Sequence, residues 1–415
     1  MNTRSVLNIS KHDTIGRRFN NLDAREGFTA HGWRAKFACW SDRKGPSYDV
    51  QQATGKTNRL ITKALAKLGR YTGNVNGYYR NAEAIRQLPF YQQADLLHFH
   101  IVHEEYLSVK DWLRLSHDKP VVWTWHDPYM LSGHCIYSLD CNGFETGCRT
   151  CPHLDYHFRV HRDRSARNLE EKRAAVRKMD PLVIVASEYM LDLIKRSVYR
   201  DFIRTRVLPF GVKPLKTLSQ SDAKARLGIP EANVAVGFRA VYSDYKGIDL
   251  VKAALGRLSS NYPNIPFTII TLQEKGFCQG LSPSYQVIDA GWIEDEEIDI
   301  YYAAMDFFLM PSRAEAFGLM AIEAMAAGAC PIVTYGTALP ELVDAPMHSI
   351  CTEHDPERFA QAVETAVFEQ KHHNAKRTAR QAYAAERYNL DHFCKSLATL
   401  YDEEYEHYHC IRRTS

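Results

Sequence analysis

Two glutamates separated by seven residues form the most informative pattern in the chain. Glu315 lies in a loop after an expected strand, and Glu323 lies within a helix expected to begin near Phe317 or Gly318. The unpaired N–H groups and the positive dipole end of such a helix favour a bound phosphate. Carboxylates do not hold phosphates, but they accept hydrogen bonds from sugar hydroxyls. The segment therefore suggests a site for a phosphorylated sugar. A helix-stabilising Glu beside a solvated Glu would give the same pattern.

A histidine and an aspartate stand at the end of another expected strand. The run Val121–Trp125 is typical of a buried strand, and His126 and Asp127 follow it directly. At such a position the imidazole can contact a ligand, while Asp127 can orient the ring or help to position an acceptor. The alternative is that His126 has a structural role, as most single histidines do.

Four cysteines gather in one short stretch. Cys135, Cys141, Cys148 and Cys151 are separated by five, six and two residues. Four thiolates at such spacing can form a closed tetrahedral zinc site, which would be structural because it leaves no position open for substrate. Free thiols in a loop, or a redox pair, are the alternatives.

The elements that must position these residues alternate regularly. Apolar runs with β-branched residues recur between segments of helical period, which is typical of a doubly wound α/β fold with parallel sheets. The expected strands form one series, Val6–Ile9, Lys36–Trp40, Leu96–His100, Val121–Trp125 and Leu182–Ala186, and a second series, Val234–Phe238, Phe267–Leu272, Phe307–Met310 and Pro331–Thr334.

The length of 415 residues favours two domains, because single hydrophobic cores usually divide beyond about 250 to 300 residues. Residues 208–214 contain two prolines and one glycine and have the composition of a linker. We therefore place the first domain at residues 1–212 and the second at 213–390. Residues 391–415 carry an apolar helical stripe and are expected to pack back on the first domain. Ligands of such sheets bind at the carboxyl ends of strands, so a cleft between the domains is the expected site.

The charge of the chain is distributed unevenly. Lys and Arg exceed Asp and Glu by 12 in residues 1–213 and fall short of them by 9 in residues 214–415. The basic half could face an anionic membrane or a phosphate-bearing acceptor, or it could simply be a solvated surface. No nucleic-acid-binding motif is present in the sequence, so nucleic acid is not an expected partner.

The sequence also bears on where the protein works. It contains no apolar run long enough for a membrane span, and its first residues lack the apolar region of a secretory signal. Ten cysteines in a chain of this length are too few for a disulfide scaffold. We expect a cytoplasmic protein that can associate with the inner face of the cytoplasmic membrane through its basic first domain.

The segment around the two glutamates resembles a family signature. Glu-Ala-Phe-Gly-Leu followed by Glu-Ala-Met-Ala-Ala-Gly is similar to the signature of the family-4 glycosyltransferases, which are retaining enzymes that use nucleotide sugars and have a GT-B fold. Residues 186–190, 208–212, 287–306 and 337–341 resemble further motifs of this family. The four-cysteine insertion resembles one in a subset of its bacterial members. The resemblance implies two Rossmann-like domains facing across a cleft, with the nucleotide sugar held by the second domain.

The resemblance assigns the donor phosphates to cations and to a helix end. Residues 237–247 resemble the strand and loop that supply an Arg and a Lys to the donor diphosphate, which here are Arg239 and Lys246. Fixed cations can stabilise a departing diphosphate without a metal, so no catalytic metal is expected. The backbone N–H groups of Gly318, Leu319 and Met320 would contact a phosphate.

The resemblance also assigns the sugar and ribose contacts. It places Glu323 on the ribose, Glu315 on the transferred sugar and His126 beside that sugar. Ile293 and Gly16 are implied as further donor contacts, although the loop around Gly16 carries one glycine where the family usually has several. His126, Glu315, Arg239 and Lys246 are the expected catalytic residues.

The expected activity is transfer of a hexose, with retention, from a nucleotide-diphosphate sugar to a glycan or polyprenyl-diphosphate-linked glycan. The expected process is the assembly of a surface polysaccharide, such as O-antigen, capsule or exopolysaccharide. Two alternatives remain open: a GT-B nucleotide-sugar epimerase, which needs no acceptor, and an inactive sugar-binding scaffold.

Overall fold

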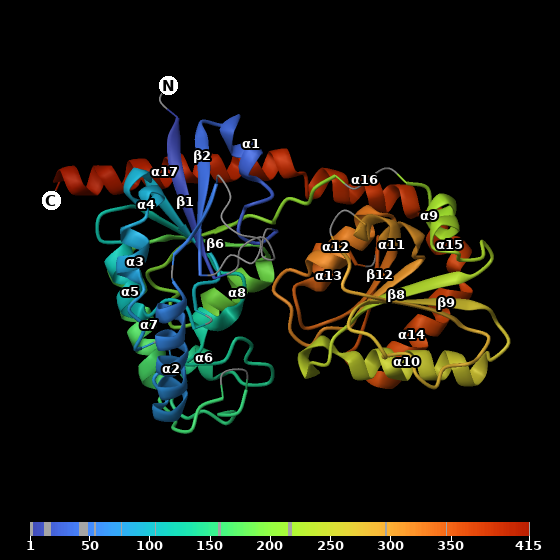
Figure 1. Cartoon of the computed structure of the whole chain (residues 1–415). Coiled ribbons are helices and arrows are strands. Elements are labelled where there is room, and N and C mark those ends of the chain that lie inside the picture. The colour runs from blue at the N-terminus through green and yellow to red at the C-terminus, as the bar shows by residue number, and fades with distance from the viewer. Residues whose placement is uncertain are drawn as a thin grey trace. The chain divides into compact units, whose positions relative to one another are not determined.

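The computed structural model describes residues 3–11, 18–40, 49–53, 55–75, 77–103, 105–156, 159–214, 218–294, 297–345 and 347–414. The chain divides into two compact units (Figure 1). Unit 1 comprises residues 1–212 together with 390–415, and unit 2 comprises residues 213–389.

Unit 1 is built on a parallel sheet. The described residues form seven strands in the order β3-β2-β1-β4-β5-β6-β7. The strands are β1 (Arg4–Ser10), β2 (Trp33–Cys39), β3 (Val50–Gln52), β4 (Leu96–Phe99), β5 (Val121–Thr124), β6 (Leu182–Val185) and β7 (Arg204–Val207). Because chain order reverses between β1 and β4, the carboxyl ends of these strands mark the position where such sheets bind ligands.

Helices and short turns connect the strands of unit 1. They are α1 (Arg25–Thr29), α2 (Lys56–Thr72), α3 (Ala82–Arg86), α4 (Pro89–Gln93), α5 (Val109–Leu115), η2 (Pro128–Leu131), α6 (Gly143–Thr146), α7 (Ser165–Met179), α8 (Glu188–Arg196) and α17 (Leu390–Thr414). Local sequence explains several starts: Ser187 caps α8 by accepting from Met190 N–H, and Ser108 forms a capping box with Asp111 at α5.

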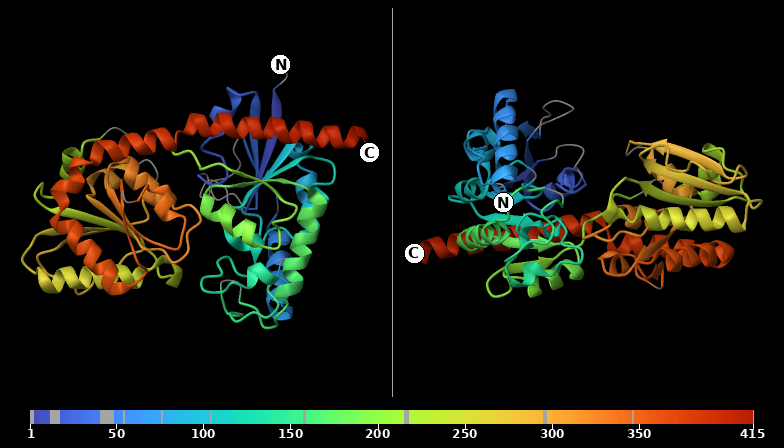
Figure 2. Two further views of the ribbon diagram at one scale, coloured as in Figure 1. Left: turned by 180° about the vertical axis from the view of Figure 1, so that it is seen from behind. Right: turned by 90° about the horizontal axis from the view of Figure 1, so that it is seen from below.

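The long final helix α17 belongs to unit 1 although it comes from the end of the chain. Figures 1 and 2 show this helix running across unit 1. Its Tyr401 is fully buried and packs against Trp33 and Phe28, with ring centroids 5.2 and 5.9 Å away. The apolar stripe of the final segment therefore contributes to the core of unit 1.

Unit 2 repeats the same topology. The described residues form six parallel strands in the order β10-β9-β8-β11-β12-β13. They are β8 (Val234–Ala240), β9 (Phe267–Gln273), β10 (Gln286–Gly291), β11 (Phe307–Met310), β12 (Cys330–Thr334) and β13 (Ile350–Thr352). The chain order reverses between β8 and β11, where Phe238 pairs with Leu309. The expected α/β fold of two doubly wound sheets is thus confirmed.

The helices of unit 2 cover both faces of its sheet (Figure 1). They are α9 (Gln220–Arg226), η3 (Asp244–Lys246), α10 (Ile248–Asn261), α11 (Ile298–Ala304), α12 (Leu319–Ala326), α13 (Leu339–Leu342), α14 (Pro356–Phe368), α15 (Gln370–Ala375) and α16 (Arg377–Arg387).

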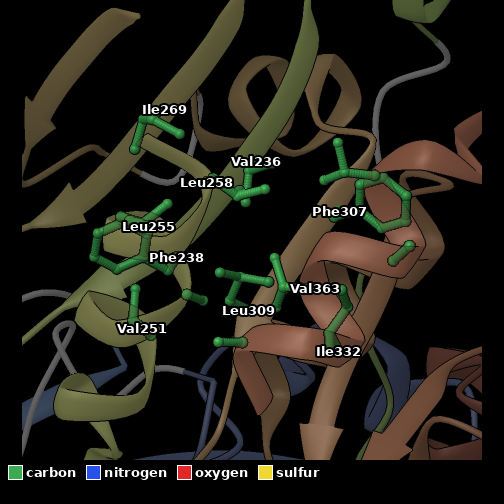
Figure 3. Packing of buried hydrophobic residues seen from close by; sticks show 14 of the residues in the cluster. Val236, Phe238, Val251, Leu255, Leu258, Ile269, Phe307, Leu309, Ile332 and Val363 are labelled. Atoms are coloured by element: carbon green, nitrogen blue, oxygen red, sulfur yellow. The ribbon is translucent and has the colours of Figure 1, made fainter. Parts of the chain in front are cut away.

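One large apolar cluster fills the space between the sheet of unit 2 and the helices α10 and α14. Phe238 and Leu309 from the sheet meet Leu255 of α10 and Val363 of α14 in this cluster (Figure 3). All four side chains are buried. The packing holds β8 and β11 rigidly, so the loops that leave their carboxyl ends start from fixed positions.

Candidate functional site

The loops that follow β8 and β11 in unit 2 are bonded to each other. The carbonyl of Tyr245 accepts hydrogen bonds from the backbone N–H groups of Arg313, at 2.9 Å, and Ala314, at 3.3 Å. Gly247 has φ of +66°, and a Cβ atom there would lie 1.8 Å from the carbonyl oxygen of Pro311. Only glycine fits such a close approach in that backbone conformation. The sequence thus brings two loops together at the point where chain order reverses.

Lys246 and Glu315 face each other across these loops. Nζ of Lys246 donates to Oε2 of Glu315 at 2.8 Å, and the two side chains are 18% and 13% exposed. The structure therefore brings together the cation expected on the diphosphate and the carboxylate expected on the sugar. In this structure the ammonium group of Lys246 and the carboxylate of Glu315 neutralise each other's charge.

Arg239 and Gln273 form a second polar pair at the same edge of the sheet. Arg239 lies near the end of β8, and its Nε donates to Oε1 of Gln273, the last residue of β9. Gln273 has φ of +86°, an unusual value for a residue with a side chain. The sequence did not single out Gln273, because a polar residue at the end of a strand is common.

The helix expected near Phe317 begins at Leu319. Gly318 precedes it with φ of +82°, and a Cβ there would lie 2.3 Å from Cδ2 of Leu339. The same hypothetical atom would lie 3.5 Å from Cγ of Glu315. The start of α12, with Leu319 and Met320, is therefore adjacent to the Lys246–Glu315 pair. Its eight residues give the helix a short dipole that points its positive end at this place.

Glu323 lies inside the protein. It is 5% exposed, and its Oε2 accepts a hydrogen bond from the hydroxyl of Tyr302 in α11 at 3.1 Å. Buried carboxylates need such partners, so part of the expected ribose contact is engaged by Tyr302. Ile293 follows β10 and is half-buried. Gly16 falls outside the described residues.

His126 sits at the carboxyl edge of the sheet in unit 1, within a group of polar side chains. Its Nε2 lies 3.1 Å from Nδ1 of His100, and Nε2 of His100 lies 3.0 Å from Oδ1 of Asn8. The ring of His126 stacks on that of Phe210, with centroids 5.2 Å apart. Burial lowers the pKa of His126 to about 4, so the ring is neutral at pH 7.

The network extends to the last helix of the chain. His98 lies on β4, and His100 follows the last residue of that strand. The two rings are 4.1 Å apart. His98 Nδ1 lies 2.7 Å from the hydroxyl of Tyr401, and its Nε2 lies 2.7 Å from Oγ1 of Thr124. Burial lowers the pKa values of both His98 and His100 well below the usual value. Two histidines spaced by two residues in an otherwise apolar strand were the sequence signal for this network.

Asp127 orients the chain after His126. Its Oδ1 accepts from the N–H of Tyr129 at 2.9 Å and caps η2, while its Oδ2 lies 3.4 Å from Nε2 of His103. Although burial opposes ionisation, the nearby His103 and these hydrogen bonds hold the pKa of Asp127 below its ordinary value. Asp127 therefore stays an anion that fixes the turn after β5.

The four cysteines lie close enough to influence one another's pKa values. Cys141 and Cys151 each raise the pKa of Cys135, a minor effect beside burial, and burial raises the pKa of Cys148 to about 11. Residues 131–154 are all described, yet nowhere in the described chain do three His, Cys, Asp or Glu side chains form a group that could hold a metal ion. The zinc site expected from the cysteine spacing stays a prediction; in this structure Sγ of Cys141 accepts from the N–H of Gly143 at 3.3 Å.

A buried lysine supports the loop between His126 and these cysteines. Lys172 of α7 is 1% exposed, and its Nζ donates to the carbonyls of Tyr129, at 2.8 Å, and Ser132, at 3.0 Å. Burial lowers the pKa of Lys172 to about 7. Lys172 is therefore an internal support of this loop and not part of the exposed basic surface of unit 1.

Comparison with known proteins places these features in context. Residues 219–386, nearly all of unit 2, match the family Glycosyl transferases group 1. The chain is 27% identical over 268 residues to WcaC of Escherichia coli K12, which is named as a colanic acid biosynthesis glycosyl transferase. The alignment covers 60% of this chain and 62% of that protein. It is 35% identical over 187 residues to mannosylfructose-phosphate synthase of Agrobacterium fabrum, covering 41% of each chain. The aligned regions thus span less than two thirds of these relatives.

Solved structures resemble the whole chain. Sucrose-phosphate synthase of Thermosynechococcus elongatus has a TM-score of 0.68 at 18% identity, covering 96% of this chain and 98% of that one. Anabaena HepE in complex with UDP-glucose has a TM-score of 0.64 at 16% identity, covering 96% and 99%. At such identities the likeness establishes the fold. The chain has the α/β fold of the GT-B class, and its second unit matches the glycosyl transferases group 1.

Proposed function

We propose that this protein is a retaining glycosyltransferase of family 4 that moves a hexose from a nucleotide-diphosphate sugar to a glycan or lipid-linked glycan. One observation carries the proposal. At the reversal point of the sheet in unit 2, Lys246, Glu315 and the start of α12 lie on loops that are bonded to each other, and Arg239 lies near the end of β8. That combination suits a sugar attached to a diphosphate. The group 1 match covers the same loops.

The Lys246–Glu315 pair gives donor binding a defined first event. A diphosphate carries more charge than one carboxylate and competes for Nζ of Lys246. Once Lys246 turns to the phosphate, Glu315 is free to accept hydrogen bonds from sugar hydroxyls. Arg239 then adds the second fixed cation, and the N–H groups at the start of α12 receive a phosphate oxygen. Glu323, held by Tyr302, is assigned to the ribose.

Charge development explains why these residues favour reaction as well as binding. As the bond between sugar and phosphate breaks, negative charge grows on the diphosphate, and the cations stabilise it more than they stabilise the intact donor. The departing phosphate can itself accept the proton of the attacking hydroxyl, so no separate base is assigned. We assign His126 to the transferred sugar from the side of unit 1.

The acceptor assignment rests on a relative. WcaC is named for colanic acid biosynthesis, which is consistent with a role in making surface polysaccharide. HepE binds UDP-glucose, which supports a nucleotide sugar as donor. We propose a glycan or polyprenyl-diphosphate-linked glycan as acceptor.

Release of nucleoside diphosphate tests the proposal. A panel of nucleotide sugars identifies the donor by calorimetry, and acceptor-dependent release then identifies a transferase. Release without acceptor would indicate an epimerase, and binding without release would indicate a scaffold. Arg239→Ala and Lys246→Ala should each cost about 2 to 4 kcal/mol of transition-state stabilisation. Arg257→Ala is the matched control, because Arg257 pairs with Glu364 on α14. Turnover within threefold of wild type in both variants would refute the diphosphate assignment.

We further propose that α2 is the face through which unit 1 meets an anionic membrane. This helix contains five basic residues and no acidic residue. Its basic residues recur every three or four positions, and those whose side chains the structure describes form one stripe: Arg59, Lys63, Lys67 and Arg70. A neighbouring stripe exposes apolar side chains to solvent, namely Leu60 at 69%, Ile61 at 52%, Leu68 at 46% and Tyr71 at 59%.

The two stripes together match the surface of an anionic bilayer. Apolar side chains this exposed are costly in water and enter the boundary between headgroups and acyl chains favourably, while lysines bind anionic headgroups. Arg162, whose guanidinium lies 5.9 Å from the Tyr71 ring, extends the basic surface. In the described part of the chain no helix has both the length and the apolar character of a membrane span. The proposed contact is therefore peripheral.

Vesicle sedimentation tests this face. Wild-type protein should sediment with vesicles containing phosphatidylglycerol and much less with pure phosphatidylcholine. Lys63→Gln with Lys67→Gln should reduce the bound fraction, as should Leu60→Ser with Leu68→Ser. The matched controls are Lys371→Gln with Lys395→Gln and the exposed Met347→Gln, which lie outside α2. If the α2 variants bind the anionic vesicles as well as the control variants do, α2 is not the membrane contact.

A further inference from the structure

The hydrogen-bond chain that ends at His126 has a direction. Nδ2 of Asn8 donates to the carbonyl of Lys36 at 3.3 Å, which fixes the amide of Asn8 with its Oδ1 toward His100. An amide oxygen only accepts, so Nε2 of His100 must carry the hydrogen in the bond of 3.0 Å between them. Hydrogen positions follow from the network in this way rather than from the atoms alone.

The two nitrogens of the His100 ring take opposite roles, one as donor and one as acceptor. Because burial keeps this ring neutral, a hydrogen on Nε2 leaves a lone pair on Nδ1. Nδ1 of His100 lies 3.1 Å from Nε2 of His126, so Nε2 of His126 must donate. His126 is also neutral, and its remaining nitrogen, Nδ1, therefore holds a lone pair.

Neighbouring groups agree with this direction. Nδ2 of Asn21 lies 3.5 Å from Nε2 of His100, but its hydrogens have nearer acceptors in Oδ1 of Asn8, at 3.1 Å, and Nδ1 of His98, at 3.2 Å. Bonds from Asn21 to these two acceptors are compatible with the hydrogen on Nε2 of His100. Nδ1 of His98 also lies 2.7 Å from the hydroxyl of Tyr401, which can donate to it, and in that tautomer Nε2 of His98 donates to Oγ1 of Thr124 at 2.7 Å.

The last atom in this series of hydrogen bonds, Nδ1 of His126, is an unsatisfied acceptor. Nδ1 of His126 is buried and has no hydrogen-bond partner within the part of the chain that the structure describes. A buried polar atom without a partner costs roughly 1 to 3 kcal/mol, which a ligand that bonds to it can recover. Among the aromatic rings packed on His126, Phe210 is buried, whereas Phe19 is 36% exposed and contacts it edge-on at 5.9 Å. Phe19 is thus the ring neighbour that can move aside.

We propose that His100 is a positioning residue that fixes His126 in the Nε2–H tautomer, so that Nδ1 of His126 accepts a hydrogen bond from a ligand hydroxyl. This inference rests on the proposed function for the identity of the ligand as a sugar. It adds a specificity: the site selects a group that donates a hydrogen, such as a hydroxyl, over a carboxylate or a position without hydroxyl. His100 itself does not touch the ligand.

Nitrogen-15 NMR of the full-length protein labelled only at histidine tests the tautomer without any ligand. The His126 signals are assigned by their loss in His126→Gln. We expect Nε2 to be protonated and Nδ1 to be unprotonated at pH 7. A protonated Nδ1 would overturn the inference, since His100 would then donate toward His126 or toward the carbonyl of Phe19, which also faces its ring.

Two variants of His100 separate positioning from folding. His100→Asn keeps an acceptor near the position of Nδ1, whereas His100→Phe keeps a ring without one. The Phe variant should weaken binding of the nucleotide sugar about tenfold and leave binding of the bare nucleoside diphosphate unchanged, and the Asn variant should restore most of the loss. Equal sugar binding by both variants would overturn the inference. If wild-type protein binds no nucleotide sugar, the proposed function fails, and the NMR result still decides the tautomer.

Discussion

At the scale of single residues, the candidate site of unit 2 pairs each of its charged side chains with a charged or polar partner. Lys246 is paired with Glu315, Arg239 with Gln273, and Glu323 with Tyr302. Each pair joins a residue that the sequence indicates as functional to one from another element. Such pairing keeps half-buried charges stable in the free protein and makes them available to a ligand with stronger charge.

The two glutamates should therefore respond differently to loss of charge. Glu315→Gln removes the competitor for Lys246, so the affinity for bare nucleoside diphosphate should stay equal or rise, while transfer falls. Glu323→Gln should weaken nucleoside diphosphate binding itself, because this carboxylate is assigned to the ribose. Calorimetry with the bare nucleotide measures both effects. Glu364→Gln, at the salt bridge with Arg257, is the control. Equal losses in the two variants would reject the division of roles.

At the scale of elements, the sequence predicts the central strands, which have a strong physical signal, but not the short edge strands β3, β7 and β13. Short apolar runs such as Phe307–Met310 are buried on both faces of a parallel sheet and read as continuous apolar segments. The carboxyl ends of these strands then locate Lys246, Glu315 and His126 without further information.

The parts that could not be predicted depend on contacts between distant segments. Nothing local in the sequence indicates that Lys246 pairs with Glu315, 69 residues away, or that Tyr401 reaches His98, 303 residues away. Cysteine spacing predicts a metal site, but whether the thiols converge depends on the backbone of the loop, which spacing alone does not fix. The positive φ of Cys148, +52°, illustrates this.

The close approach at Gly247 gives a prediction at this scale. Gly247→Ala forces a methyl group toward the Pro311 carbonyl, 1.8 Å away, and should separate the two loops that carry Lys246 and Glu315. Gly228→Ala is the matched control, since its φ of +64° is nearly the same and no atom lies within 4 Å of the new Cβ. The control should cost about 1 kcal/mol from backbone strain alone. Gly247→Ala should cost at least about 2 kcal/mol more in the free energy of unfolding, measured by chemical denaturation. Equal costs would show that the loops tolerate separation.

At the scale of the whole molecule, the two units repeat one topology but differ in how they use polar groups. Unit 2 pairs charged side chains, both around the loops that follow β8 and β11 and in the buried ion pair of Lys224 with Asp306. Unit 1 buries a continuous group of neutral histidines and amides between its sheet and α17, the last helix of the chain. Its stability therefore depends on keeping those rings uncharged.

This dependence has a measurable consequence on acidification. The pKa of His126 is about 4 in the folded protein and near 6.5 when unfolded, and burial likewise lowers the pKa values of His98 and His100. The unfolded chain then binds more protons as pH falls below 6.5, so stability is complete above that pH and declines as pH falls toward 4. His126 alone should remove about 2 kcal/mol between pH 7.5 and pH 5.

Tryptophan fluorescence can follow this loss in unit 1 specifically. Five of the six tryptophans belong to unit 1, and Trp292→Phe removes the one in unit 2. Denaturant titrations of this variant at pH 7.5 and pH 5 should show unit 1 losing at least about 2 kcal/mol. His100→Asn, with one titrating ring fewer, should lose less over the same interval. A stability of unit 1 that does not change between these pH values would mean that the buried rings accept protons without cost.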